Sequence, residues 1–341
     1  MEKINTPIYI VMTPTRNEAW ILPAFLKATS LWADYIIIAD QMSTDGSRNL
    51  YEQFSKVEHI NLHGRKCKLI VIDNPRKEMH QAATRRLLFE EAKKIEGDKI
   101  LFTLDADEFL SGNFPETEGW RTIMNSEPGD VFEFRWMNLS SDVTKYSTWQ
   151  PYYWAAHLDE DLLNGEFPDN FIHEWRLPWP NNVKHEYVIK DVSFIHFARV
   201  NLKRQHNKER FYQVSQSAKM EKYSGVSFYR MYHPILEEVY YDVPNDVYGY
   251  YDKCSLNILS ELNLNDVGKH YTESVMHNIQ VNGAQFFRKL DIWDREFLQE
   301  NNLKDPRGIV DVMMHWYLRK TNKYSGKFIV HTIDYILKKL Y

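Results

Sequence analysis

Cysteine is scarce in this sequence, and long apolar runs are missing from it. The two cysteines, Cys67 and Cys254, lie far apart and fit neither a disulfide framework nor the spacing of metal ligands, which favours a reducing compartment. No apolar run approaches the roughly 18 residues of a membrane span. The first residues also turn polar too soon for a signal peptide. We therefore expect a cytoplasmic protein.

Several familiar catalytic motifs are missing as well. The chain has no GxGxxG dinucleotide fingerprint, no GxxxxGK(S/T) phosphate loop and no GxSxG nucleophile elbow. The His-Glu pairs at 173–174 and 185–186 lack the second histidine of a zinc protease helix. The formal net charge of −5 gives no reason to expect a nucleic-acid partner, and we predict none.

The first 110 residues alternate between short apolar runs and amphipathic stretches. Apolar, β-rich runs occupy residues 8–12, 34–40, 68–73 and 99–104, and helical patterns lie between them. For the helix that follows the second run, Ser43 or Asp45 is the predicted N-cap. This alternation predicts an α/β fold with a doubly wound, mostly parallel sheet that is covered on both faces.

The rhythm changes after residue 129. Residues 129–139 and 191–200 read as longer strands of a mixed region, separated by an aromatic, proline-bearing stretch at 149–180. Five of the ten tryptophans fall between residues 136 and 179. From residue 201 onward the pattern is mainly helical, so we expect domains at 1–200 and 201–341.

Polar residues follow each of the first four predicted strands, and the most crowded group is ILFTLDADEFL at residues 100–110. Ligands of open parallel sheets bind outside the carboxyl ends of the strands. Asp105, Asp107 and Glu108 repel one another unless water solvates them or a cation neutralises them. Asp105 and Asp107 could together meet one Mg²⁺ or Mn²⁺ ion, and the alternative is a solvated acidic turn.

Three other residues carry chemistry that the sequence leaves open. Arg85 borders the buried face of a helix and needs an anion, either a carboxylate such as that of Asp105 or a ligand phosphate. His196, in a predicted strand, is either a hydrogen-bonded core residue or a metal ligand. Glu174 lies among aromatic residues that could raise its pKa towards that of a general base, or it pairs with Arg176 or a lysine.

Four segments in order resemble glycosyltransferase family 2, whose members have the GT-A fold. They are IYIVMTPTRNE (8–18), IIIADQMSTDGS (36–47), HQAATRRLLFEEA (80–92) and ILFTLDADEFL (100–110). More weakly, FIHEW (171–175) followed by residues 193–211 resembles members that build lipopolysaccharide core and other envelope polysaccharides. The resemblance implies a nucleotide-binding half at 1–115 and an acceptor half at 116–200.

The resemblance also implies roles for individual residues. Nucleotide-sugar-binding positions of the family match Pro14, Arg16, Glu18, Asp40, Arg85 and Asp105. Asp107 matches the metal-ligating acid of the family's DXD motif, His196 a histidine that completes the metal or diphosphate site, and Glu174 the catalytic base region. Arg16 replaces the family's usual aromatic residue and Gln41 its second acid, which puts the identity of the nucleotide in doubt.

These observations favour a Mn²⁺- or Mg²⁺-dependent inverting glycosyltransferase that moves a sugar from a nucleotide-sugar donor to a hydroxyl of a glycan or lipid-linked acceptor. In this hypothesis the divalent cation explains why the carboxylates crowd together. One alternative is a nucleotidyltransferase of similar fold, which usually carries a glycine-rich basic loop after its first strand; PTRNE (14–18) is neither. The other is a catalytically silent sugar-binding protein.

The C-terminal segment combines positive charge with helical apolar spacing. Between residues 316 and 341 six basic residues stand against one acid, Asp334. A basic amphipathic helix can lie on anionic lipid, which would suit a lipid-linked acceptor and a position at the inner face of the membrane. The alternative is that this helix docks on its own domain.

Overall fold

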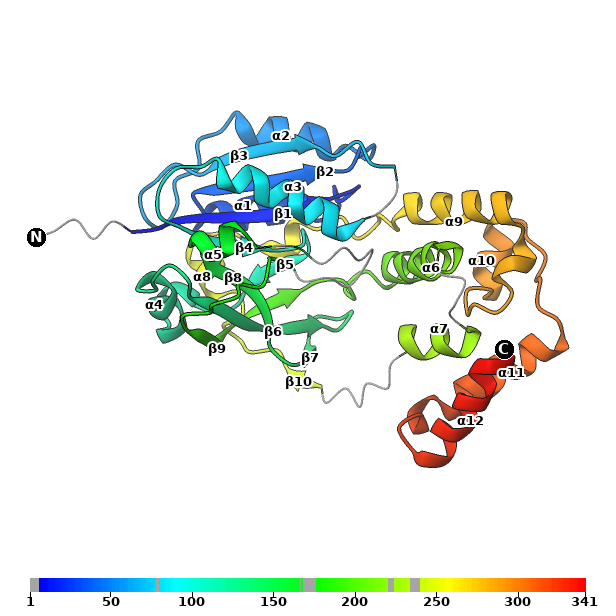
Figure 1. Cartoon of the computed structure of the whole chain (residues 1–341). Coiled ribbons are helices and arrows are strands. Elements are labelled where there is room, and N and C mark those ends of the chain that lie inside the picture. The colour runs from blue at the N-terminus through cyan, green and yellow to red at the C-terminus, as the bar shows by residue number, and fades with distance from the viewer. Residues whose placement is uncertain (1–5, 78–79, 166, 168–175, 220–223, 234–239) are drawn as a thin grey trace, which may run out of the picture. The chain divides into compact units, whose positions relative to one another are not determined.

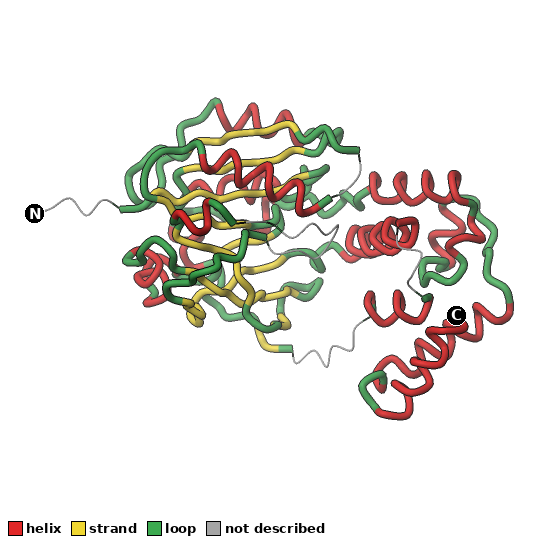
Figure 2. The backbone as a smooth tube through the Cα atoms, viewed as in Figure 1, coloured by secondary structure: helices red, strands yellow, loops and turns green. Residues whose placement is uncertain are grey.

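The computed structural model describes the chain except for residues 1–5, 78–79, 166, 168–175, 220–223 and 234–239. The chain divides into two compact units. The first unit (Met1–Val200 and Tyr240–Asn265) contains all the strands of the described residues, and the second (Asn201–Val239 and Asp266–Tyr341) is helical (Figures 1 and 2). The predicted α/β class, with a parallel core, a mixed remainder and C-terminal helices, is confirmed.

The first unit begins with alternating strands and helices and continues with longer strands. Its elements are β1 (Ile8–Thr15), α1 (Leu22–Ser30), β2 (Tyr35–Asp40), α2 (Ser47–Ser55), β3 (Lys68–Asp73), α3 (Gln81–Lys93), β4 (Lys99–Thr103), β5 (Glu108–Leu110), η1 (Phe114–Glu116), α4 (Glu118–Met124), β6 (Val131–Leu139), β7 (Lys145–Thr148), β8 (Tyr152–His157), α5 (Glu160–Leu163), β9 (Glu186–His196), β10 (Tyr241–Asp242), α8 (Gly249–Lys253) and η2 (Ile258–Glu261). The sheet order is β10-β7-β6-β8-β4-β1-β2-β3, with β9 pairing β5 and β6.

Strands β3, β2, β1 and β4 are parallel, and the two faces of this parallel core are buried by different helices. Along β1, Tyr9 and Val11 pack into the cluster that contains α1 and α2. Ile10 and Met12 point to the opposite face, where α3 covers them. Because successive side chains of a strand alternate between faces, burial on both sides requires the continuous apolar runs seen in the sequence.

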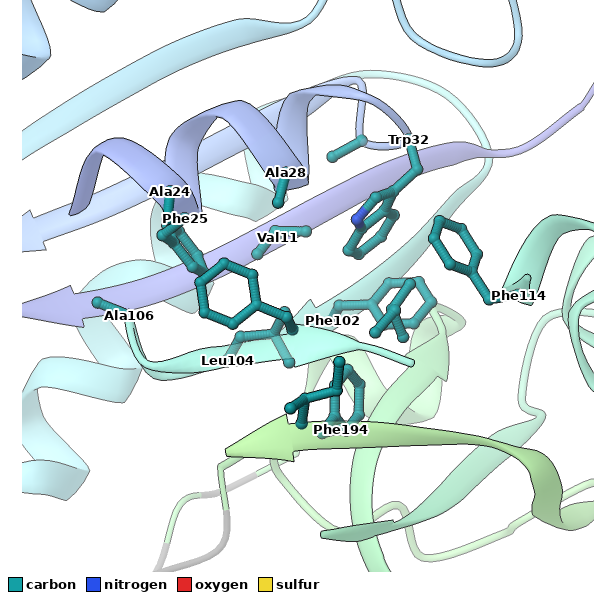
Figure 3. Close-up of a cluster of buried hydrophobic side chains, with 14 of the residues drawn as sticks. Val11, Ala24, Phe25, Ala28, Trp32, Phe102, Leu104, Ala106, Phe114 and Phe194 are labelled. Atoms are coloured by element: carbon teal, nitrogen blue, oxygen red, sulfur yellow. The ribbon is translucent and has the colours of Figure 1, made fainter. Parts of the chain in front are cut away.

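The larger cluster is rich in aromatic rings (Figure 3). Trp32, just after α1, makes edge contacts with Phe102 of β4, with Phe114 and with Trp120 of α4. These rings are almost completely buried, so they hold the helices of this face against the sheet. Pro23 lies in the first turn of α1, where a missing N–H costs no helical hydrogen bond.

The N-cap prediction for α2 was wrong. Gly46, at φ 98°, is the N-cap residue instead of Ser43 or Asp45. The Ser43 hydroxyl accepts the Asn17 N–H at 2.8 Å. One Asp45 carboxylate oxygen accepts the N–H of Ser47, the first residue of α2, at 3.0 Å, and the other accepts the Ala19 N–H at 2.8 Å. Both residues therefore tie the loop after β2 to the loop after β1.

The aromatic stretch at 149–180 contains a strand that the sequence did not reveal. This strand, β8, pairs antiparallel with both β4 and β6 and so joins the parallel core to the mixed region. The long strand β9 pairs antiparallel with β5 and parallel with β6. His196, at the end of β9, is thereby opposite Glu108 on one side and Asn138 on the other.

The second unit is built from helices. They are α6 (Leu202–Lys219), α7 (Gly225–Tyr232), α9 (Lys269–Asn282), η3 (Ala284–Phe287), α10 (Arg295–Glu300), α11 (Ile309–Thr321), η4 (Asn322–Tyr324) and α12 (Phe328–Leu340). Helices α6 and α9 pack together, and α7 contacts both α11 and α12. Within the described residues we find no helix with the length and apolar character needed to cross a membrane.

Truncation of Phe102, which is fully buried, tests the aromatic cluster. We expect Phe102→Ala to lower the free energy of unfolding by about 3–5 kcal/mol, because it removes a buried ring and leaves a cavity. The exposed Val57→Ala should change it by less than about 0.5 kcal/mol. Urea denaturation followed by circular dichroism measures both. Equal effects would contradict the assignment of this cluster as the core.

Candidate functional site

The carboxyl ends of the four parallel strands bring their polar residues to one edge of the sheet. The register places Thr15 of β1 opposite Asp40 of β2, and Asp40 opposite Asp73 of β3. Strand β4 lies on the other side of β1, and the acidic segment, residues 105–108, follows it directly. The predicted gathering of polar residues at this edge is therefore present.

Asp40 is fully buried under this edge and is well supplied with hydrogen-bond donors. Its carboxylate accepts the Tyr51 hydroxyl at 3.2 Å and the Ser43 N–H at 3.2 Å. Arg48 lies 2.8 Å from Asp40 and 2.7 Å from Asp73. Burial, with the charge of Asp40 beside it, raises the pKa of Tyr51, so this hydroxyl stays protonated and donates. Asp40 therefore holds the loop after β2 in place.

The loop after β1 is fixed to its neighbours through backbone contacts. Asn17, at φ 57°, accepts the Thr44 N–H at 2.7 Å with its side-chain oxygen. Arg16 donates to the carbonyl of Lys77 at 3.3 Å, and Gln41 donates to that of Arg76 at 2.8 Å. The two residues that depart from the family's pattern, Arg16 and Gln41, thus both reach the segment after β3.

Two arginines hold Asp105, the first acid of the acidic segment. Arg85 of α3 is buried and donates to one carboxylate oxygen at 2.6 Å, while Arg176 donates to the other at 2.9 Å. Arg85 also donates to the Thr103 hydroxyl at 2.9 Å. The carboxylate partner that the sequence offered for Arg85 is therefore present in the structure.

Glu108 is fully buried and shares Arg176 with Asp105. The Arg176 guanidinium contacts both oxygens of Glu108, one of them at 2.8 Å. Glu108 also accepts the indole N–H of Trp136 at 2.8 Å and the backbone N–H of Asp105 at 2.8 Å. A buried carboxylate is stable when a cation pairs with it and its lone pairs are satisfied, and Glu108 meets both conditions.

These contacts correct part of the reasoning from sequence. Arg85 and Arg176 supply positive charge to Asp105 and Glu108, so the crowding of carboxylates alone does not require a metal ion. Burial lowers the pKa of Arg176, but the carboxylates of Asp105 and Glu108 outweigh it, and the net shift is upward. Burial lowers the pKa of Arg85. Asp105 acts against this shift and the like charge of Arg176 adds to it, and the net shift is downward.

Asp107, the second aspartate of the acidic segment, lies next to His196. The Nε2 atom of His196 is 3.7 Å from a carboxylate oxygen of Asp107. Nδ1 of the same ring is 2.6 Å from the side-chain oxygen of Asn138, which can only accept, so Nδ1 carries the proton. The lone pair of Nε2 is then free to act as a ligand on the side that faces Asp107.

The Asp107–His196 pair fits a divalent cation that keeps most of its coordination sphere for water and substrate. Among the described residues there is no group of three or more His, Cys, Asp or Glu side chains that could hold a metal ion. Mg²⁺ commonly binds through one or two carboxylates together with substrate phosphates, and an imidazole suits Mn²⁺-class ions. Two such side chains could supply part of a ligand set, with the remaining positions left to other groups.

A series of aromatic rings extends outward from the acidic segment. The Trp136 ring stacks on His196 with centroids 4.9 Å apart, and the Arg176 guanidinium lies over the rings of Trp136 and Trp154. Trp136 also contacts Trp149 and Tyr152, both of which are exposed. Flat exposed rings of this kind can stack on the CH faces of sugars. The innermost ring, Trp136, is hydrogen-bonded to Glu108 of the acidic segment.

The structure brings some of the predicted site residues together and leaves one undescribed. Arg85 meets Asp105, and Asp107 meets His196. Glu174 lies outside the described residues. Pro14, Arg16 and Glu18 lie in β1 or the loop after it, where Glu18 accepts the Trp20 indole N–H at 2.7 Å.

Sequence reasoning missed other members of the site. Arg176 was considered only as a partner for Glu174, and its pairing with Asp105 and Glu108 was not foreseen. Residues Arg48, Tyr51, Trp136 and Asn138 were also missed, because their roles depend on contacts between segments far apart in the chain. The run of tryptophans was the one available signal for Trp136.

This geometry is that of an α/β protein with a polar site at the carboxyl edge of a parallel sheet. Residues 10–117, which span β1 to η1, match the model of glycosyl transferase family 2. The chain therefore contains a glycosyl transferase family 2 domain, and this domain makes it an enzyme, a glycosyltransferase that depends on a nucleotide sugar. The match ends before β6 and does not include the second unit.

Two solved structures resemble the chain weakly. A nucleoside-diphosphate-sugar pyrophosphorylase from Vibrio cholerae RC9 is 10% identical with a TM-score of 0.28, over 45% of this chain and 75% of that one. HddC from Yersinia pseudotuberculosis is 11% identical with a TM-score of 0.28, over 56% of this chain and 93% of that one. Similarity at this level carries no argument about activity. No curated protein matches the chain.

Removal of Arg176 tests the charge network. We expect Arg176→Met to lower the free energy of unfolding by about 3–5 kcal/mol, because Glu108 is then a buried charge without its cation. Adding Glu108→Gln should recover part of this loss, since it removes the unpaired charge and keeps the shape.

Arg121→Met, which removes an exposed ion pair with Glu118, is the matched control and should change stability by less than about 0.5 kcal/mol. Urea denaturation of the three variants and the wild type measures these differences. A double variant that is less stable than Arg176→Met would contradict the network.

Proposed function

We propose that this chain is a metal-dependent inverting glycosyltransferase that moves a sugar from a nucleotide-sugar donor to a hydroxyl of a glycan or lipid-linked acceptor. The observation that carries the proposal is the Asp107–His196 pair, which lies beside carboxylates that arginines neutralise. Asp107 belongs to the glycosyl transferase family 2 domain, and His196 lies outside the matched residues. We take the envelope polysaccharides that the weaker resemblance implies as the acceptor class.

The nucleotide would bind over the loops that follow β1 and β2. Pro14, Arg16 and Glu18 are partly exposed there and would contact the base and ribose. Asp40 is buried beneath them, and in this proposal it acts through the loop that it holds. Asp105 would contact the ribose, and Arg85, which donates to Asp105, fixes the orientation of that carboxylate.

Asp107 and His196 would hold Mn²⁺ or Mg²⁺. When bound, the ion supplies positive charge to the diphosphate leaving group. Asn138 orients the His196 ring through its hydrogen bond to Nδ1, as partners of metal-ligating histidines generally do. Arg176 keeps Asp105 and Glu108 neutralised, so these acids do not repel the incoming diphosphate.

Glu174 would remove the proton from the acceptor hydroxyl as its oxygen attacks the anomeric carbon. Attack from the face opposite the departing diphosphate forms the new C–O bond as the old one breaks, which inverts the anomeric centre. The exposed rings of Trp149 and Tyr152 would contact the acceptor. The C-terminal helix would make peripheral contact with a membrane that presents a lipid-linked acceptor.

Metal removal tests the donor site. A nucleoside diphosphate should raise the melting temperature only when Mn²⁺ or Mg²⁺ is present, because the diphosphate and Asp107 repel each other without a cation. Thermal unfolding is measured with UDP and with GDP, each in the presence of metal and in excess chelator. Equal stabilisation in chelator would contradict metal-dependent binding.

Two matched amide substitutions separate the metal ligand from the base. Asp107→Asn should weaken Mn²⁺-dependent donor binding by about tenfold or more, because the diphosphate loses its bridge to the protein. Glu174→Gln should leave donor binding unchanged and lower transfer by about 10²–10⁴-fold, the usual effect of losing a general base.

Calorimetry measures donor affinity, and nucleotide release with an acceptor measures transfer. Normal donor binding by Asp107→Asn would remove Asp107 from the metal site. Near-normal transfer by Glu174→Gln would mean that another residue is the base. A wild-type protein that binds donor and releases no nucleotide with any acceptor would instead favour a silent sugar-binding protein.

A further inference from the structure

Helix α11 carries an apolar stripe that faces away from the core of the second unit. Ile309, Val312, Met313 and Trp316 recur at the spacing of one helix face, and all are exposed, Trp316 at 63%. The opposite face of α11, with Asp311, His315 and Leu318, is buried. Because the helix already buries one face, the stripe is not needed for packing in this unit.

Helix α12 repeats this arrangement. Its inner face docks within the unit: Asp334 accepts from Arg230 of α7 at 2.8 Å and from the Tyr317 hydroxyl at 3.0 Å. Its outer face exposes a second apolar stripe, Phe328, Ile329, Ile333, Ile336 and Leu340, with Phe328 exposed at 84%. The sequence left two alternatives for this helix, docking on its own domain and lying on lipid. The inner face of α12 docks within the unit, and the outer face is the one that the lipid alternative concerns.

The exposed charges of these two helices have one sign. Between residues 309 and 341, all of which the structure describes, the acids are Asp311 and Asp334, and both are buried. Five lysines in the same stretch are exposed: Lys320, Lys323, Lys327, Lys338 and Lys339. Arg319 is paired with Asp291 at 2.7 Å. The solvent-facing surface thus combines two apolar stripes with lysines and no exposed carboxylate.

We propose that α11 and α12, which we call the C-terminal helix pair, bind the surface of an anionic lipid bilayer. Apolar side chains would enter the boundary between headgroups and acyl chains, and the lysines would meet lipid phosphates. Trp316 is of the residue type that favours this boundary. Each helix has 13 residues, too short to cross the bilayer, so the pair lies on it.

Charge argues against a second copy of this chain as the partner. A symmetric dimer through the C-terminal helix pair would bring the same five lysines of each copy together, and like charges across an interface are unfavourable. An anionic bilayer has the complementary charge and also accepts apolar side chains. This inference rests on the membrane contact of the proposed function. It adds which faces of α11 and α12 meet the bilayer and that the lipids are anionic.

Vesicle flotation of the full chain tests the proposal without donor or acceptor, so its failure leaves the transferase proposal standing. The wild type should float with phosphatidylcholine vesicles that contain phosphatidylglycerol and should not float with phosphatidylcholine alone. Trp316→Asp with Ile329→Asp should abolish flotation. Val281→Asp, at an exposed valine of α9 in the same unit, is the matched control and should float as the wild type does.

A charge-reversal pair tests the electrostatic part. Lys320→Glu with Lys327→Glu should weaken binding to the anionic vesicles by at least about tenfold. The control, Lys269→Glu with Lys304→Glu, changes two exposed lysines outside the helix pair and should have a much smaller effect. Circular dichroism and the melting temperature confirm that each variant is folded.

Several outcomes would overturn the proposal. These are no flotation of the wild type, equal flotation with neutral vesicles, and flotation that the helix-pair variants do not affect. A fourth is a wild type that does not bind vesicles and is a dimer in light scattering, when Trp316→Asp with Ile329→Asp dissociates that dimer. The C-terminal helix pair would then be a protein interface.

Discussion

A carboxylate buried without a partner cation strongly destabilises a fold, and in this chain Arg176 is the cation that pairs with the buried Glu108. The same guanidinium reaches Asp105, which also binds Arg85 of α3. One ion network thus joins the end of β4, the start of β5, helix α3 and Arg176, where the next described segment begins. The position of the acidic segment depends on this network. The approach of Asp107 to His196 therefore depends on it too.

Much of the parallel core could be predicted from the sequence because its signals are local. Continuous apolar runs identified β1 to β4, and the carboxyl-edge rule identified where polar residues gather. The helical position of Arg85 indicated that it needed an anion, and Asp105 is that anion. An ion pair of this kind can be predicted when the local sequence pattern around each residue already indicates that the residue needs a partner.

What could not be predicted depends on contacts between distant segments. The role of Arg176 follows from its approach to acids that lie some 70 residues earlier in the chain, 71 for Asp105 and 68 for Glu108. Strand β8 was hidden because aromatic and proline residues around it resemble a loop, and only its pairing with β4 and β6 defines it. Ser43 and Asp45 have good N-cap chemistry, but Ser43 bonds the loop after β1, and Asp45 divides its two oxygens between that loop and the first N–H of α2.

Strand β9 pairs with β6 in two separate stretches, and this has a consequence for how its length can vary. Its first part is aligned through Val188 opposite Glu133, its second through Ser193 opposite Arg135, and the register shifts between them. Ser193 is locked to Ser111 by hydrogen bonds of 2.8 and 2.9 Å. Residues 189–192, between the two stretches, pack against α4: Ile189 and Val192 are buried, and Asp191 accepts the Gly119 N–H at 3.1 Å. A change of length there would therefore disturb α4 first, while the stretch that begins at Ser193 keeps His196 in register with β6.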